Sequence, residues 1–292
     1  MGGPGCRDDV SCYKGRVRKR WSFRLLAAAV CAAAGLSVAH AQWRFMEGNF
    51  PARFPPPSMP DRDFAFCKIM YNSVRYEHLG MGWSTDYPYA GINLMIRFSE
   101  LTTGRVSVDK RGEPNHWVVR FTDDALFNCP FTMAADVGTI GFSNEEVVRL
   151  RQYLLKGGFL WVDDFWGSRA WVHWEREIGR VLPPSQYPIR DLPLSHPVFR
   201  TQMHVLEVPQ ITAIQFWYGV GGRTTSERGY DSREPHLRGI ADEHGRLLVV
   251  MSHNTDVADA WEREAEDPRY FERFSPDGYG LGINVLLYTM MH

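Results

Sequence analysis

The stretch GGFLWVDDFWG, residues 157–167, decides the fold class of this chain. Its two leading glycines predict the end of a helix, because glycine adopts the left-handed conformation of a helix C-cap at little cost. The unbroken apolar run at 159–162 is typical of a strand that is covered on both faces. Asp163 and Asp164 follow, and in an open α/β sheet the carboxyl ends of the strands border the ligand crevice. We therefore expect an α/β protein with a site at this strand end.

The sequence on both sides of this stretch alternates between strand and helix patterns. That alternation predicts a doubly wound, mostly parallel sheet, and a tight turn at His244-Gly245 adds an antiparallel hairpin near the C-terminal part. The predicted strands are 64–71, 105–109, 117–121, 131–135, 159–162, 237–242 and 246–252, with further extended pieces at 203–208 and 211–218. The predicted helices begin at Tyr89, behind a capping box of Ser143 and Glu146, near Trp171 and at Asp277.

The first 41 residues have the three parts of a secretory signal peptide. Basic residues at 16–24 precede an apolar segment at 25–38, which is short for a membrane span. Ala39-His40-Ala41 is typical of a cleavage site, so we expect an exported chain that begins at Gln42; an uncleaved anchor is the alternative. Residues 42–63 are proline-rich and predict an extended lead-in, and residues 64–292 are expected to form a single α/β domain.

Charge and cysteine content narrow the class of protein. Residues 1–41 hold seven of the 33 basic and two of the 34 acidic residues, so the remainder carries a net charge of −6. A nucleic-acid-binding protein would show a basic face instead. Cys67 and Cys129 remain beyond residue 41, and they would form either a disulfide in an oxidising compartment or two separate buried thiols. The chain has no zinc-type spacing of Cys and His.

Polar residues follow four of the predicted strands, at 72–75, 136–138, 163–167 and 253–262. Because parallel strands end at the same edge of a sheet, we expect these residues to converge. Close carboxylates raise one another's pKa values, which suits one of them to act as an acid and another as a base. Alternatively, they would bind a hard cation through oxygen ligands. The candidates are Asp136, Asp164, His196, Asn254, Asp256, Asp259 and Glu262.

Asp163 and Asp164 are expected to have different roles. Neighbouring residues of a strand point to opposite faces, so at most one of the two faces the crevice. We assign the ligand contact to Asp164 and a structural role to Asp163, since carboxylates also cap helices. Trp166 and Trp261 would either stack on a sugar ring or close the core.

The strand at 131–135 has no nucleophile where an α/β hydrolase would place one. Residues 134–138 read AADVG, without Ser or Cys. The chain also lacks a P-loop, a dinucleotide fingerprint after a strand and an HExxH motif. The sequence therefore assigns neither a cofactor nor a metal site.

Five segments together resemble one family. In chain order they are WSTDYP at 83–88, the stretch at 157–167, LPLSHPVF at 192–199, NTDVADAWE at 254–262 and GIN at 282–284. With these segments the chain is similar to the bacterial exported family called domain of unknown function 4159, over about residues 64–292. More distantly, the strand order and the His-Pro turn resemble the flavodoxin-like, class I glutamine-amidotransferase-like fold. That resemblance implies a nucleophile cysteine where this chain has Asp136 or its neighbours.

These observations favour a binding module of the periplasm or cell envelope that accepts a small polar ligand, for example a sugar. Two other functions stay open: a hydrolase that uses carboxylates or a metal ion, and an envelope interaction module that contacts its partner through residues 185–235. We expect no nucleic-acid partner and no stable membrane span after signal cleavage. The predicted ligand-binding residues are Asp136, Asp164, Trp166, His196, Asn254, Asp256 and Trp261.

Overall fold

The computed structural model describes residues 50–292 of the chain. The predicted signal peptide and its cleavage site lie outside the described residues, as do residues 42–49 of the lead-in. Among residues 50–292, no helix is both long and apolar enough to cross a membrane.

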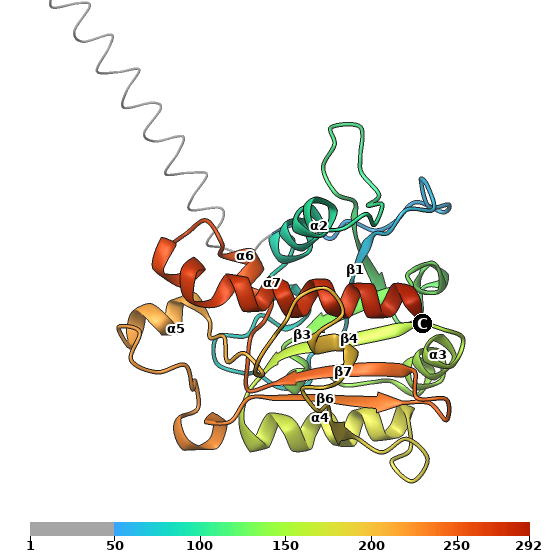
Figure 1. Ribbon diagram of the computed structural model, residues 1–292. Coiled ribbons are helices and arrows are strands. Elements are labelled where there is room, and N and C mark those ends of the chain that lie inside the picture. The colour runs from blue at the N-terminus through green and yellow to red at the C-terminus, as the bar shows by residue number, and fades with distance from the viewer. Residues whose placement is uncertain (1–49) are drawn as a thin grey trace, which may run out of the picture. The chain divides into compact units, whose positions relative to one another are not determined.

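Seven strands form one sheet in the order β2-β1-β3-β4-β7-β6-β5 (Figure 1). The first five strands of this order run parallel, whereas β6 pairs with both β7 and β5 in the antiparallel sense. The predicted α/β class, the mostly parallel sheet and its antiparallel C-terminal part are thus confirmed. The strands are β1 (Phe66–Met70), β2 (His116–Arg120), β3 (Phe131–Ala135), β4 (Phe159–Phe165), β5 (Arg190–Asp191), β6 (His236–Ala241) and β7 (Leu247–His253).

Helices cover both faces of the sheet, and each face has its own apolar core. One core lies under α2, α5, α6 and α7, and the other under α3 and α4. Figure 1 shows α7, in red, crossing over the sheet. The helices are α2 (Tyr89–Leu101), α3 (Asn144–Leu155), α4 (Gly167–Val181), α5 (Ile214–Gly219), α6 (Asp259–Glu262) and α7 (Pro268–Met291). Short 3-10 turns are η1 (Gly82–Ser84), η2 (Asp124–Asn128), η3 (Val137–Thr139), η4 (Pro197–Phe199) and η5 (Gly229–Ser232).

The central strand β4 alternates between the two cores until it reaches its acidic end. Trp161 packs under α7, and Val162 packs with the α4 side. Both are fully buried, and burying one such side chain stabilises a fold by about 1.5–3 kcal/mol. The pairing of β4 with β7 then shifts register between Val162 and Phe165. The shift falls at Asp164, whose φ is 53°.

The predicted strand at 105–109 is wrong. Val106 and Val108 make only isolated bridges, to Phe64 and Pro114. The edge of the sheet is occupied instead by β2, close to the strand that the sequence predicted at 117–121. A short alternating segment therefore did not compete with the more apolar β2 for pairing with β1.

Two segments near the C-terminus are more helical than their patterns predicted. Residues 211–218 were expected to be extended, but Ile214–Gly219 forms α5. The first N–H of α5 donates to the distant carboxylate of Asp259, a contact that a local pattern does not reveal. The terminal helix begins at Pro268 rather than at 277, because Asp267 caps it by accepting from the N–H of Arg269.

Cys67 and Cys129 form a disulfide, which settles the alternative that the sequence left open. The bond joins β1 to the segment that leads into β3, across 62 positions of the chain. Both cysteines are almost fully buried in the core under α3 and α4.

The described part of the lead-in contacts the outer edge of the sheet. The carbonyl of Arg53 accepts from the N–H of Val118 in β2 at 2.9 Å. The guanidinium group of Arg53 lies over the ring of Trp117 and donates to Asn115 at 2.9 Å. These contacts cover the backbone edge of β2, which would otherwise be open to pairing.

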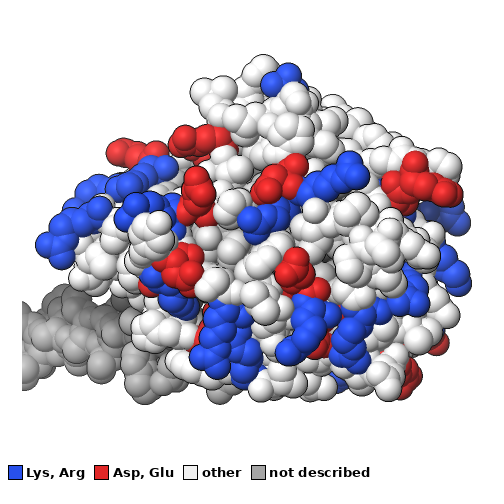
Figure 2. Space-filling model, turned by 90° about the horizontal axis from the view of Figure 1, so that it is seen from below, with Lys and Arg blue, Asp and Glu red and all other residues white. Residues whose placement is uncertain are grey.

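Charges are intermixed on the face of the molecule that Figure 2 shows. Lys and Arg side chains alternate there with Asp and Glu side chains. The picture agrees with the composition of the chain, which has 33 basic and 34 acidic residues. This face therefore differs from the continuous basic surface that attracts nucleic-acid phosphates.

Candidate functional site

Three strand ends meet at the carboxyl edge of the sheet. The N–H of Asp136, just after β3, donates to the carbonyl of Asp163 in β4 at 3.1 Å. On the other side of β4, the N–H of Asn254 donates to the carbonyl of Phe165 at 3.0 Å. Asp136, Asp164 and Asn254 have φ values of 52°, 53° and 61°, a left-handed conformation that costs non-glycine residues energy and clusters at functional sites. The structure therefore brings these three predicted residues together.

Six carboxyl groups in this region form what we call the acidic cluster. Burial raises the pKa of every member, and the charge of Asp86 raises the pKa of the other five further. The rise reaches about 7 for Asp163 and for Asp259. The members are Asp86, Asp163, Asp164, Asp256, Asp259 and Glu262.

Asp86 is the member that sequence reasoning missed. It lies in the loop between η1 and α2, its exposed fraction is 4%, and its Oδ2 has no hydrogen-bond partner among residues 50–292. Burial raises its pKa, and the nearby charges of Lys68 and Arg263 oppose that rise. The ammonium group of Lys68, which is buried in β1, donates to the carbonyl of Thr85 at 2.7 Å. The only signal in the sequence was the position of Asp86 within the segment 83–88.

Asp163 and Asp256 hold the beginning of α6. Asp163 Oδ2 accepts from the N–H of Ala258 at 2.8 Å, and Asp256 Oδ1 accepts from the N–H of Asp259 at 3.0 Å. Both bonds satisfy N–H groups that the first turn of a helix leaves without a partner. The bond from Ala258 gives Asp163 the structural role that we expected. Its second carboxylate oxygen, Oδ1, remains without a donor among the described residues.

Asp164 also belongs to the acidic cluster, and the expectation that at most one of the two neighbouring aspartates faces the crevice stays a prediction. The charges of Asp86, Glu227 and Asp136 add to burial in raising the pKa of Asp164. Its Oδ1 accepts from Trp166 Nε1 at 2.8 Å. The left-handed backbone at Asp164 breaks the strand alternation on which the expectation was based.

The short helix α6 supplies two carboxylates next to a basic residue. Asp259 Oδ2 accepts from the N–H of Ile214 at 2.8 Å and from the hydroxyl of Tyr270 at 3.0 Å. Arg263 Nε lies 3.4 Å from Asp259 Oδ1 and 2.9 Å from Glu262 Oε2. The same guanidinium group reaches Glu266 at 2.7 Å. Asp259 is therefore fixed on one side, while its other oxygen shares Arg263 with Glu262.

The acidic cluster has more negative than positive charge. Lys68 and Arg263 are the basic residues whose charges oppose the pKa rises of its members. If all six carboxyl groups were ionised, these two cations would leave a net charge of −4 in a buried site. Uncompensated buried charge is strongly unfavourable. Bound protons, a bound cation or a positively charged ligand must therefore balance part of the cluster.

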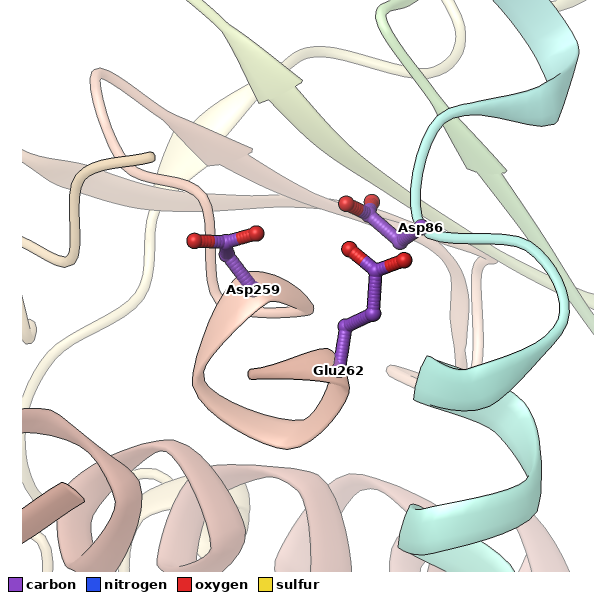
Figure 3. A group of neighbouring side chains, drawn as sticks. All are labelled: Asp86, Asp259 and Glu262. Carbon is purple, nitrogen blue, oxygen red and sulfur yellow. The ribbon is translucent and has the colours of Figure 1, made fainter. Parts of the chain in front are cut away.

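Three members of the acidic cluster are placed to share one cation. Asp86, Asp259 and Glu262 each offer a carboxylate oxygen, and these oxygens lie within 4.8 Å of one another. Figure 3 shows the three carboxylates facing a common space, with Asp86 opposite the helix that carries the other two. The arrangement has the oxygen chemistry of a hard-cation site.

Asp136 lies beside the acidic cluster on the side of β3. Its Oδ2 accepts from the N–H of Gly82 at 2.8 Å. Burial raises the pKa of Asp136 to about 7, and the charges of Glu77 and Asp86 contribute to the rise. A Cβ atom at Gly80 would collide with Oδ2 of Asp136, so any larger residue at this position would displace the carboxylate.

The two predicted tryptophans are packed inside the molecule. Trp261 is fully buried, and its ring centroid lies 5.5 Å from that of Trp161. Trp166 is 4% exposed and donates to Asp164. Their burial favours the core interpretation over stacking on a sugar, although Trp166 does orient a member of the acidic cluster.

His196 lies at the opposite edge of the sheet from the acidic cluster. It lines a groove of about 1020 Å³ together with Arg246 and Leu247, where β7 begins. Burial lowers the pKa of His196, and its Nδ1 accepts from the N–H of Val198 at 3.3 Å. The structure does not bring His196 together with the other predicted site residues.

Asn254 connects the strand ends to a second groove. Its side-chain oxygen accepts from the N–H of Gly167 at 2.8 Å, where α4 begins. It also lines a groove of about 540 Å³ with Trp171, Arg238 and His253. Burial lowers the pKa of His253 to about 4, so its imidazole is neutral at physiological pH.

Comparison with known proteins gives a family. Residues 67–290 match the model of the family described as Domain of unknown function (DUF4159). The match covers most of the chain, so the chain belongs to this family, as the resemblance of its five segments predicted. No functionally curated protein matches the chain.

Proposed function

We propose that this member of the family binds a small polar ligand at the acidic cluster. The observation that supports this function is the pair of buried acceptors that have no donor among residues 50–292, Asp86 Oδ2 and Asp163 Oδ1. A buried acceptor without a partner costs about 1–3 kcal/mol. A ligand that brings hydroxyl groups, an ammonium group or a cation regains this energy and reduces the excess negative charge. Sugars and other polyols belong to the first of these classes.

The absence of a Ser or Cys nucleophile supports binding rather than covalent catalysis. Within a flavodoxin-like, glutamine-amidotransferase-like sheet, the residue after the third strand of the chain is the position of the nucleophile. Asp136 follows β3 here, and its φ of 52° gives the sharp turn that such a position needs. Fold similarity alone does not give function, so the ligand site is inferred from the carboxylates and not from the sheet.

Thermal melting of the purified chain tests this function. The chain is melted with and without panels of saccharides, polyols and small amines. A ligand that binds only the folded state at a hundredfold excess over its Kd raises the unfolding free energy by about 2.7 kcal/mol. We expect one class of ligand to raise the melting temperature, and Asp164→Asn and Asp256→Asn to reduce the shift.

Asp191→Asn is the matched control, because the side chain of Asp191 is 69% exposed in β5 and remote from the acidic cluster in the sheet order. It should retain the full shift. Shifts of equal size in Asp164→Asn, Asp256→Asn and the wild type would show that the ligand binds elsewhere.

A carboxylate-dependent hydrolase is the second candidate. It is favoured by the different environments of Asp136 and Asp164: the pKa of the first rises to about 7, and that of the second lies well above its ordinary value. Near neutral pH one would serve as a base and the other as an acid. A panel of chromogenic esters and glycosides tests this, and activity that survives in both Asp136→Asn and Asp164→Asn would exclude the pair.

We also propose that the chain works outside the cytoplasm, in the periplasm or cell envelope. The signal-like residues 1–41 motivate this location, and the Cys67–Cys129 disulfide supports it, since such bonds persist in oxidising compartments. Fractionation of cells that express the full chain tests the location. A soluble cytoplasmic protein with reduced cysteines would contradict it.

A further inference from the structure

We propose that Asp86, Asp259 and Glu262 bind a divalent metal ion of the oxygen-preferring class, such as Mg²⁺, Mn²⁺ or Ca²⁺. This inference deepens the function proposed above, because it names one ligand of the same acidic cluster. In this proposal Asp259 and Glu262 of α6 and Asp86 of the loop before α2 are ligands of the same ion. Throughout residues 50–292, this is the group of His, Cys, Asp and Glu side chains whose ligand atoms converge closely enough for one ion.

The spacing of the three carboxylates fits such an ion. Oxygen ligands bind these metals at about 2.0–2.6 Å, so two oxygens on one ion lie roughly 3–5 Å apart. The oxygens of Asp86, Asp259 and Glu262 lie within 4.8 Å of one another. Figure 3 shows the three carboxylates already turned toward a common space.

A second observation points to a ligand independently of the acidity of the site. Asp86 is 96% buried, and its Oδ2 has no hydrogen-bond donor among the described residues. The carboxylate of Asp86 is directed toward the space that it shares with Asp259 and Glu262 (Figure 3). Such an oxygen is costly unless something outside the chain binds it.

The surrounding residues fix some of these oxygens and leave others for the ion. Ile214 and Tyr270 donate to Asp259 Oδ2, which holds that carboxylate in one orientation. Arg263 contacts Asp259 Oδ1 and Glu262 Oε2, and it also contacts Glu266. An entering cation would take over the neutralising role of Arg263 at the first two carboxylates, and Arg263 would keep Glu266 as a partner.

The chemistry of the three ligands selects the class of metal. All three are carboxylates, and neither His nor Cys belongs to the group. Carboxylate oxygens suit Mg²⁺, Ca²⁺ and Mn²⁺, whereas soft thiolate ligands and imidazole suit Zn²⁺ and Cu. Solvent oxygens would complete the coordination of the ion.

Electron paramagnetic resonance of free Mn²⁺ tests the site. The full chain is treated with a chelator, dialysed and titrated with Mn²⁺, whose free-ion signal falls on binding. We expect the wild type to bind one Mn²⁺, and Ca²⁺ or Mg²⁺ to return it to solution. Asp86→Asn and, as a second variant, Glu262→Gln should each weaken Mn²⁺ binding by at least about 10-fold. Even mutation of a residue that only hydrogen-bonds to a metal ligand typically lowers metal affinity about 10- to 100-fold. Asp191→Asn should bind Mn²⁺ like the wild type.

Two outcomes would overturn the metal site. One is a wild type that leaves Mn²⁺ free up to about 1 mM, the weak end of Ca²⁺ affinities in proteins. The other is equal affinity in the wild type, Asp86→Asn and Glu262→Gln. Repeating the melting panel in the presence of a chelator separates the two proposals. If a saccharide, polyol or amine raises the melting temperature but Mn²⁺ does not bind, only the metal proposal is rejected. If Mn²⁺ binds but none of these compounds raises the melting temperature, only the organic-ligand proposal is rejected.

Discussion

Individual aspartates at the carboxyl edge of the sheet adopt backbone conformations that aspartate tolerates better than most residues. Asp86, Asp136 and Asp164 all have positive φ values. Each of these turns directs a carboxylate into a buried region, where burial raises the pKa. These aspartates therefore combine the energy cost of a left-handed backbone with the cost of burying a carboxylate. Both costs are typical of functional sites, where a bound ligand can compensate them.

Asp136→Asn tests the electrostatic cost directly. The pKa of Asp136 rises from 3.8 in the unfolded chain to about 7 in the folded protein, chiefly through burial. A raised pKa means that the wild type loses stability as the pH increases through this window, because the buried carboxyl group must ionise. An amide does not ionise, and its oxygen still accepts from Gly82. We expect Asp136→Asn to be more stable than the wild type by up to about 4 kcal/mol at pH 8, and nearly equal to it at pH 4.

Urea denaturation at pH 4, 6 and 8 measures this difference. Glu207→Gln provides the comparison, because Glu207 is exposed and its side chain forms no ion pair or hydrogen bond among residues 50–292, so this variant should follow the wild type at all three pH values. A stability difference between Asp136→Asn and the wild type that does not change with pH would contradict the raised pKa.

The helices show how local sequence signals and distant contacts share the control of structure. In α3 the signal is local: Ser143 Oγ accepts from the N–H of Glu146, and the Glu146 carboxylate accepts from the N–H of Ser143. In α6 the first turn is held from a distance by Asp163 in β4. Helices of the first kind are predictable from sequence, and those of the second kind depend on the assembled sheet.

Ser143→Ala should destabilise the protein by about 1 kcal/mol, because the N-cap of α3 loses its side-chain acceptor. Chemical denaturation measures the loss. Ser99→Ala, at an exposed position of α2, is the control and should be neutral or slightly stabilising, since alanine favours helix. Equal effects of the two substitutions would show that the capping box does not contribute.

The sequence predicted most of the central strands and part of the site, for identifiable reasons. Residues 159–162, the predicted part of β4, are apolar enough to specify a buried strand without tertiary information. The segment 105–109 and residues 117–121 were both predicted as strands, and only the more apolar β2 pairs along the length of β1. Asp86 escaped prediction because it reaches the acidic cluster from a loop far away in the chain. The ion pair of Arg263 with Asp259 and the interruption of strand pairing at Asp164 likewise depend on three-dimensional contacts.

Across the whole molecule, one sheet with two covered faces brings its loops to a common edge. The disulfide fixes β1 to the segment before β3, and therefore the strands on one side of the acidic cluster. Contacts of α6 with β4 and α5 fix the other side. The acidic cluster thus lies between two parts of the fold that are restrained independently.

Replacing both cysteines by alanine should lower the unfolding free energy by about 4 kcal/mol, the loop-entropy value for a bridge that spans 62 positions. Urea unfolding with and without reductant measures this loss. Reductant should destabilise the wild type and leave the Cys67→Ala, Cys129→Ala double variant unchanged. A wild type that is insensitive to reductant, although its cysteines are shown to be reduced, would contradict the stabilising role of the disulfide.

The acidic cluster as a cation site is tested most directly by a crystal of the full chain grown with Mn²⁺ and measured for anomalous scattering. We predict a single strong anomalous peak between the carboxylates of Asp86, Asp259 and Glu262, with metal–oxygen distances of about 2.0–2.6 Å. The peak should disappear in Asp86→Asn. An acidic cluster without anomalous density at saturating Mn²⁺, with its carboxyl groups paired by shared protons instead, would contradict the cation site.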